Sequence, residues 1–130
     1  MAEELVGKKI LLVDDDADIL TAMQTALADT GATIETANDG DQAVMKIASV
    51  MPDLVVLDMM LPKRSGFLVM ERLKRSRKGG IGPRVIMITG NQGTRHKVYA
   101  ERLGVSLYLN KPFRMDRLVA SIKELLVVTS

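Results

Sequence analysis

The sequence predicts an α/β protein in which five parallel strands lie between two layers of helices, as a doubly wound (βα)5 three-layer sandwich. Two observations predict this class: short apolar runs that end in polar residues, and segments with helical spacing between those runs. Their alternation with short connections is typical of parallel strands joined by right-handed helical crossovers. The chain has 130 residues, the length of one ordinary domain of about 100–150 residues. We therefore expect a single domain over residues 1–130.

The strands are predicted from five short segments. Four of them, residues 10–13, 54–57, 85–88 and 105–109, are continuously or almost continuously apolar and end in polar side chains. Continuous apolarity indicates that both faces of a strand are covered, as in the interior of a parallel sheet. Residues 33–37 (TIETA) alternate instead, which favours a half-exposed strand at one edge.

The helices are predicted from apolar residues at helical spacing. Ile19, Met23 and Leu27 recur at i, i+4 and i+8, and Gly31 stands where a helix C-cap is expected. Similar stripes cover 43–48, 67–73 and 118–126, whereas 94–103 has a thin one made by Val98, Ala100 and Leu103.

Composition excludes several classes of protein. There are no cysteines, which excludes a disulfide framework, a cysteine-type zinc finger and thiol chemistry. No apolar stretch approaches the roughly 20 residues of a membrane span, and residues 1–4 (MAEE) do not resemble a secretory signal, so we expect none. We expect a soluble cytoplasmic protein without a membrane partner.

The charges are divided unevenly along the chain. Residues 1–58 hold twelve acidic and three basic residues, and residues 59–130 hold four acidic and fifteen basic ones. Such asymmetry raises the possibility of an acidic or nucleic-acid partner, although basic residues that solvate helix faces explain it more simply. With two Phe, two Tyr and no Trp, an aromatic platform for nucleic acid is unsupported. We expect no nucleic-acid binding by this domain alone, and His96, the only histidine, is expected to be exposed to solvent.

Polar side chains that could carry chemistry follow four of the predicted strands directly. Functional groups of doubly wound sheets collect outside the carboxyl ends of the strands. Four acids, one hydroxyl and one amine are therefore expected to converge on one rim: Asp14, Asp15, Asp16, Asp58, Thr89 and Lys111.

This set of side chains favours phosphoryl transfer. Crowded carboxylates repel one another and need a cation among them. Lys111 supplies one positive charge, and Mg²⁺, which prefers oxygen ligands and phosphate, supplies two more. An aspartate beside such an ion can attack phosphorus and form an aspartyl phosphate, while Lys111 and Thr89 donate hydrogen bonds to the phosphoryl oxygens.

Four stretches also match, in order, the motifs of a known family. They are ILLVDDD at 10–16, VLDMMLPKRSG at 56–66, VIMITG at 85–90 and YLNKPF at 108–113. The chain thus resembles the response-regulator receiver domains of two-component signalling, in particular the chemotaxis-type single-domain regulators, over a core of about residues 8–126. The resemblance implies the flavodoxin-like strand order 2-1-3-4-5.

The resemblance implies a role for each matching acid. Asp58 is the expected phosphoacceptor, taking a phosphoryl group from a phosphohistidine of a histidine kinase or histidine phosphotransfer protein. The expected Mg²⁺ ligands are Asp14, Asp15, Asp58 and the backbone carbonyl of Met60.

The resemblance also implies how phosphorylation is read out. Lys111, in a cis linkage to Pro112, is expected to pair with the acceptor and then with the phosphoryl oxygens. Thr89 and Tyr108 are the expected switch residues, which alter the surface of the last two helices and the last strand toward a downstream protein effector.

Other functions are compatible with parts of this pattern. The chain is either a stand-alone switch or a receiver module excised from a larger regulator or hybrid histidine kinase. A haloacid-dehalogenase-type phosphatase also uses an aspartate after a strand, but its second acid two residues on is here Met60. We therefore expect no enzymatic activity other than the domain's own phosphorylation and slow dephosphorylation.

Overall fold

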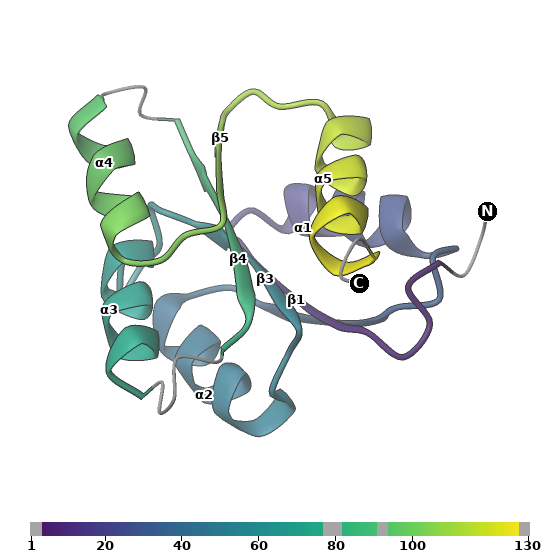
Figure 1. Cartoon of the computed structure of the whole chain (residues 1–130), viewed down its shortest axis with the longest axis horizontal. Helices are drawn as coiled ribbons and strands as arrows, with labels where there is room; N and C mark the ends of the chain where they lie inside the picture. The colour runs from purple at the N-terminus through teal and green to yellow at the C-terminus, as the bar shows by residue number, and fades with distance from the viewer. Residues whose placement is uncertain (1–3, 77–81, 91–93, 128–130) are drawn as a thin grey trace.

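The predicted alternation of strands and helices is present in the computed structural model of the chain, which describes residues 4–76, 82–90 and 94–127. In chain order the elements are β1 (Lys9–Val13), α1 (Ala17–Leu27), β2 (Thr33–Ala37), α2 (Gly40–Val50), β3 (Leu54–Asp58), α3 (Gly66–Ser76), β4 (Arg84–Thr89), α4 (Thr94–Arg102), β5 (Leu107–Asn110) and α5 (Met115–Val127). Figure 1 shows the sheet between two groups of helices.

All neighbouring strands of the sheet pair in parallel, in the order β2-β1-β3-β4-β5. This order confirms the predicted flavodoxin-like α/β fold, and the alternating segment 33–37 forms an edge strand, β2. Because β1 and β3 are adjacent at the centre, the residues that follow them end at the same point of the rim.

Two predictions at the ends of elements are wrong by more than one residue. The last strand begins at Leu107 and not at residue 105, because the Val105 amide donates to the Ala100 carbonyl at the end of α4 (3.2 Å). Gly31 does not cap α1: the Thr30 hydroxyl donates to the Leu27 carbonyl (2.7 Å), and Gly31, at φ +87°, turns the chain toward β2.

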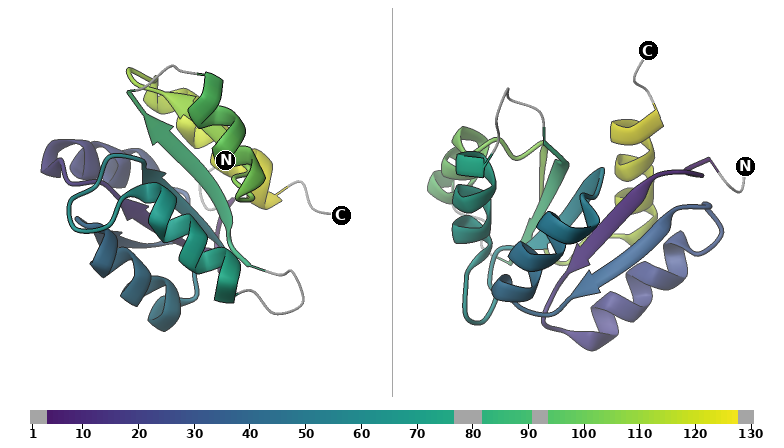
Figure 2. Two further views of the ribbon diagram at one scale, coloured as in Figure 1. Left: turned by 90° about the vertical axis from the view of Figure 1, so that its left-hand side faces the viewer. Right: turned by 90° about the horizontal axis from the view of Figure 1, so that it is seen from below.

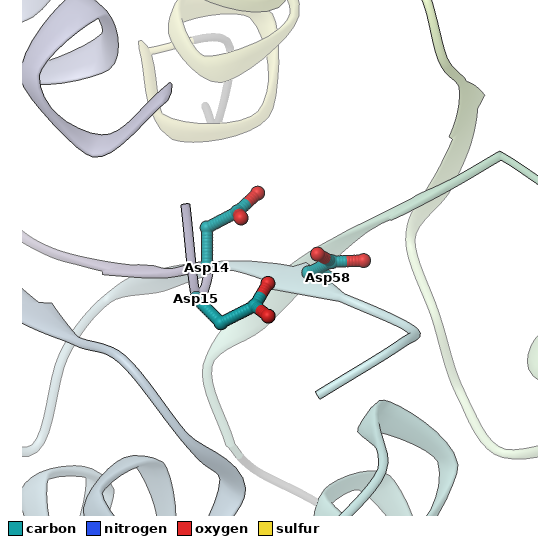
Figure 3. Close-up of side chains that lie close together, drawn as sticks. All are labelled: Asp14, Asp15 and Asp58. Carbon is teal, nitrogen blue, oxygen red and sulfur yellow. The ribbon is translucent and has the colours of Figure 1, made fainter. Parts of the chain in front are cut away.

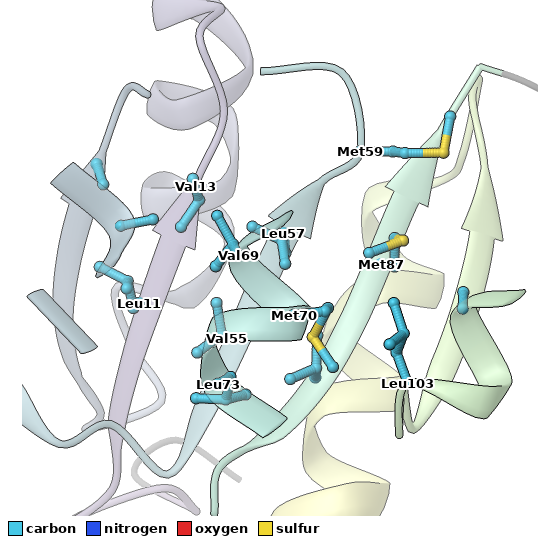
Figure 4. Close-up of a cluster of buried hydrophobic side chains, with 14 residues drawn as sticks. Leu11, Val13, Val55, Leu57, Met59, Val69, Met70, Leu73, Met87 and Leu103 are labelled. Carbon is cyan, nitrogen blue, oxygen red and sulfur yellow. The ribbon is translucent and has the colours of Figure 1, made fainter. Parts of the chain in front are cut away.

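Two apolar layers hold the helices against the sheet (Figures 1 and 2). One joins the sheet to α1 and α5 through Ile10, Leu12, Met23, Leu27, Val56, Ile86, Leu118 and Ile122. The other joins it to α2, α3 and α4 through residues such as Leu11, Val13, Ala43, Val55, Leu57, Val69, Met70 and Ala100. Figure 4 shows part of this layer. Each fully buried Leu, Ile, Val or Met side chain contributes about 1.5–3 kcal/mol to the stability of the fold. The sheet therefore holds the residues at its carboxyl edge in fixed positions.

The helices are short and amphipathic. Within the ranges that the structure describes, no helix combines the length and the apolarity needed to cross a membrane.

Candidate functional site

Three of the four predicted acids gather at the carboxyl ends of the two central strands. Asp14 and Asp15 follow β1, and Asp58 is the last residue of β3. One carboxylate oxygen of each lies within 4.8 Å of the others. Figure 3 shows the three side chains close together at this edge of the sheet. The parallel pairing of Val13 with Leu57 places them there.

The fourth acid does not join the cluster. Asp16 is the N-cap of α1, where its Oδ1 accepts hydrogen bonds from the amides of Asp18 (2.9 Å) and Ile19 (3.3 Å). The expectation that four acids converge is therefore wrong in this one residue, since a helix that starts here needs an acceptor for its first amides.

Asp14 is an acid in an unfavourable environment. It is almost completely buried, and its Oδ1 accepts a hydrogen bond from the Asp16 amide (2.9 Å). Burial, together with repulsion from Asp58, raises the pKa of the Asp14 carboxyl above its ordinary value, despite the opposing effects of the Asp16 amide and Lys111. Its Oδ2 is buried and accepts no hydrogen bond from the part of the chain that the structure describes.

Lys111 provides the cation of the cluster. Its Nζ lies 3.3 Å from Asp58 Oδ2 and 3.5 Å from Asp14 Oδ2. Burial alone would lower the pKa of the Lys111 ammonium, but the attraction of Asp58 and Asp14 outweighs burial, and the pKa lies above its ordinary value. The Lys111–Pro112 peptide bond is cis, as predicted.

Asp58 is held in place on both of its oxygens. Oδ1 accepts a hydrogen bond from the Met60 amide (3.1 Å), and Oδ2 faces the Lys111 ammonium. These contacts restrict the rotation of the carboxylate. The role of the Met60 carbonyl as a metal ligand stays a prediction.

Thr89 and Tyr108 lie together on the neighbouring strands. Thr89 ends β4 and is fully buried, and its carbonyl accepts a hydrogen bond from the Lys111 amide (2.7 Å). Burial raises the pKa of the Tyr108 phenol, and the nearby Thr89 side chain offsets part of that effect. The Tyr108 hydroxyl is buried, so this ring lies inward, beside Thr89. Whether the two residues switch stays a prediction.

The donor set fits a hard divalent cation. Three carboxylates within 4.8 Å of one another carry more negative charge than one ammonium neutralises. All three side chains are oxygen donors, which suits Mg²⁺ better than the softer metals that select imidazole or thiolate.

Two features near the site were missed by sequence reasoning. The loop between β3 and α3 is joined to the start of α2 by two ion pairs, Lys63–Asp39 and Arg64–Asp41. His96 is half-buried and not exposed, with its ring centroid 5.8 Å from that of Phe67. The sequence does show acids at 39 and 41 and bases at 63 and 64. It could not predict these two ion pairs, because the contact between the two segments depends on the tertiary fold.

Comparison with known proteins agrees with this geometry. A family model described as "Response regulator receiver domain" matches residues 10–123. The chain is 42% identical over 115 residues to the transcriptional regulatory protein DltR of Streptococcus agalactiae serotype III, covering 88% of this chain and 50% of that protein. It is 37% identical over 121 residues to the alkaline phosphatase synthesis transcriptional regulatory protein PhoP of Bacillus subtilis, covering 93% and 49%.

A solved structure is similar along almost the whole chain. The CheY-like response regulator receiver domain protein from Methanospirillum hungatei is 31% identical, with a TM-score of 0.82, covering 90% of this chain and 91% of that one. The chain therefore belongs to the response regulator receiver domain family of two-component signalling. It spans about half the length of the curated relatives named above.

Proposed function

We propose that Asp58 is a phosphoacceptor that takes a phosphoryl group from a phosphohistidine of a histidine kinase or histidine phosphotransfer protein. An Asp58 carboxylate oxygen forms a bond to phosphorus while the phosphorus–nitrogen bond breaks, and the electron pair of that bond stays on the imidazole. The observation that carries the proposal is the Lys111 ammonium, 3.3 Å from Asp58 Oδ2, beside a cluster of carboxylates.

The proposed Mg²⁺ ligands are Asp14, Asp15, Asp58 and the Met60 carbonyl. Bound there, Mg²⁺ would neutralise charge on the phosphoryl oxygens and allow an anionic donor to approach the acids. The buried Oδ2 of Asp14, whose one neighbouring cation among the described residues is the Lys111 ammonium that it shares with Asp58, and the oxygen-only donor set support this assignment.

The protein's own groups orient the reaction. The Met60 amide and the Lys111 ammonium fix the acceptor carboxylate. Once Asp58 is phosphorylated, Lys111 would pair with the phosphoryl oxygens, and the Thr89 hydroxyl would donate to them. The domain would catalyse only its own phosphorylation and slow dephosphorylation.

The proposed output is a change in the surface formed by α4, β5 and α5, coupled to the site through Thr89 and Tyr108. The names of the two curated relatives support a transcriptional output, delivered to a partner protein or to a further segment of a longer chain. A pull-down that compares beryllofluoride-treated with untreated protein tests whether partner binding depends on the modified state.

The phosphorylation itself is tested with acetyl phosphate and Mg²⁺, followed by mass spectrometry of the intact protein. We expect a gain of one phosphoryl group in the parent and in Asp29→Asn, an exposed acid beyond the end of α1, and no gain in Asp58→Asn. A parent that gains no mass, or an Asp58→Asn variant that gains it equally, contradicts the proposal.

A further inference from the structure

The loop between β3 and α3, residues 59–65, leaves the acceptor and returns to it. At its base the Gly66 amide donates to the Met59 carbonyl (2.8 Å). A Cβ on Gly66 would lie only 2.6 Å from the Asp58 carbonyl oxygen, so only glycine permits this close return. The base of the loop is therefore fixed by the backbone of the acceptor strand itself.

The far side of the same loop is seated on the first residue of α2. The Gly40 amide donates to the Pro62 carbonyl (3.2 Å). A Cβ on Gly40 would lie 1.9 Å from the Arg64 carbonyl oxygen and 2.4 Å from the Arg64 Cβ. Two backbones therefore touch at this point, and any side chain at position 40 would push the loop away.

Two ion pairs flank that backbone contact. Lys63 Nζ lies 3.5 Å from Asp39 Oδ2, and Arg64 Nε lies 3.2 Å from Asp41 Oδ1. Asp39 also caps α2, because its Oδ1 accepts a hydrogen bond from the Gln42 amide (2.8 Å). One carboxylate oxygen of Asp39 thus caps the helix, and the other pairs with a lysine of the loop.

The loop adopts a backbone conformation that needs outside support. Lys63 has φ +66°, and the Arg64 amide donates to the Pro62 carbonyl (2.7 Å) across it. A turn of this kind is sparsely populated for a residue with a side chain. The contacts with Asp39, Gly40 and Asp41 all fall on residues 62–64, where that conformation occurs.

We propose that the start of α2, through Asp39, Gly40 and Asp41, is a positioning element that sets the Mg²⁺ affinity of the acceptor site. This inference rests on the proposed function. The loop that α2 holds contains Met60, whose amide orients Asp58 and whose carbonyl is the proposed backbone ligand. Asp39, Gly40 and Asp41 would act only through that loop.

The inference is tested by Mg²⁺ titration calorimetry on Gly40→Ala and Asp39→Asn. The outer partners of metal ligands commonly change affinity by about 10–100-fold, and we expect about tenfold weaker binding for Gly40→Ala. Asp39→Asn keeps a capping side chain but loses the charge facing Lys63. We expect about threefold weaker binding, as for the loss of one ion pair whose lysine is exposed.

The matched control is Glu35→Gln. It breaks the Glu35–Lys46 ion pair (3.6 Å), which joins the same helix to β2 away from the loop. Its Mg²⁺ affinity should equal that of the parent. The amide resonances of Met60 and Gly66 in ¹⁵N NMR spectra should shift in the two test variants and not in the control.

A second readout separates positioning from a general loss of structure. At saturating Mg²⁺ the acetyl phosphate reaction of Asp39→Asn should regain the parent rate, because only the Mg²⁺ requirement has changed. If Gly40→Ala does not fold, Lys63→Gln takes its place, and its effect should not add to that of Asp39→Asn.

The inference is overturned if Mg²⁺ affinity is unchanged both in Asp39→Asn and in Gly40→Ala, or in Lys63→Gln where that variant replaces Gly40→Ala. It is also overturned if the parent does not bind Mg²⁺. Failure of the proposed function has a different signature. The parent would bind Mg²⁺, with weaker binding in the variants, yet never gain a phosphoryl group on Asp58.

Discussion

Asp14 at the end of β1 and Asp39 at the start of α2 are both withdrawn from solvent, with 1% and 6% of their surface exposed. Their electrostatic surroundings are opposite. The Gln42 amide, together with the Lys63 ammonium, holds the pKa of the Asp39 carboxyl below its ordinary value. Burial and the charge of Asp58 raise the pKa of Asp14.

The difference separates an acid that supports the fold from an acid that we propose to bind a metal ion. Both oxygens of Asp39 have partners within the protein, so its charge is favourable when the chain folds. Asp14 has two acidic neighbours and shares one ammonium with Asp58. Its charge is unfavourable in the folded protein until a cation joins the cluster.

The largest expected effect is the stabilisation of the acid cluster by Mg²⁺. A ligand that binds only the folded state at a concentration 100 times its Kd adds about 2.7 kcal/mol to the free energy of unfolding. We expect this gain in the parent and its loss in Asp15→Asn, which removes the proposed ligand that is exposed. Thermal unfolding in MgCl₂, against NaCl of equal ionic strength, measures it. An equal gain in both proteins would show that the cluster does not hold the ion.

A smaller effect on stability is expected at Asp39, where contacts within the protein, and not a bound ion, stabilise the carboxylate. Asp39→Ala removes the capping oxygen of α2 and the partner of Lys63, and the Tm should fall by about 5 °C. Asp39→Asn should lose much less, because asparagine caps a helix about as well. Calorimetric melting of the two variants checks this order. Equal losses would mean that the charge, and not the cap, makes Asp39 stabilising.

Asp14→Asn should stabilise the folded protein, in contrast to Asp39→Ala. Asparagine keeps an oxygen for the Asp16 amide and removes a buried charge next to Asp58. Without Mg²⁺ we expect the free energy of unfolding to rise by about 1 kcal/mol, the typical size of a single-residue effect. Urea unfolding in the presence of EDTA measures this change. A variant less stable than the parent would show that Lys111 already compensates both acids.

Local pattern was sufficient to predict most of the sheet and the members of the acid cluster. Continuous apolar runs identified the central strands, and the acids that follow β1 and β3 meet because parallel strands end at one rim. The strand order could not be predicted in this way, since no local pattern distinguishes 2-1-3-4-5 from other orders. That part came from the resemblance to a family.

Two errors, at Asp16 and at His96, share one physical cause, which is that a residue type is compatible with two environments. Asp16 can face a metal or cap a helix, and the requirement of α1 for an acceptor decided it. His96 can face water or pack on Phe67, and the thin apolar stripe of the α4 segment did not predict which. The contact of Asp39 with Lys63 depends on where two loops lie in space, which single-segment patterns do not contain.

The smallest expected effect is a dependence of stability on pH that originates at Asp14 alone. Because its pKa in the folded protein is raised above the ordinary 3.8, the folded state keeps a proton that the unfolded state has released. Without Mg²⁺, stability should therefore decrease as pH rises from about 3.8 through the folded-state pKa of Asp14. Asp39 has the opposite sign: its lowered pKa gives stability that is present above the ordinary value and lost as pH falls.

These opposed contributions are separated by comparing the parent with Asp14→Asn across that pH range, since Asp39 is common to both proteins. The two free energies of unfolding should coincide at low pH, where Asp14 is protonated and resembles the amide, and should diverge as pH rises, with the variant becoming the more stable. Added Mg²⁺ should reverse the order above the window, because it stabilises the ionised carboxylate that the variant lacks. A stability difference independent of pH would mean that the Asp14 carboxyl titrates alike in the folded and unfolded chains, and its contrast with Asp39 would then be one of hydrogen bonding and not of charge.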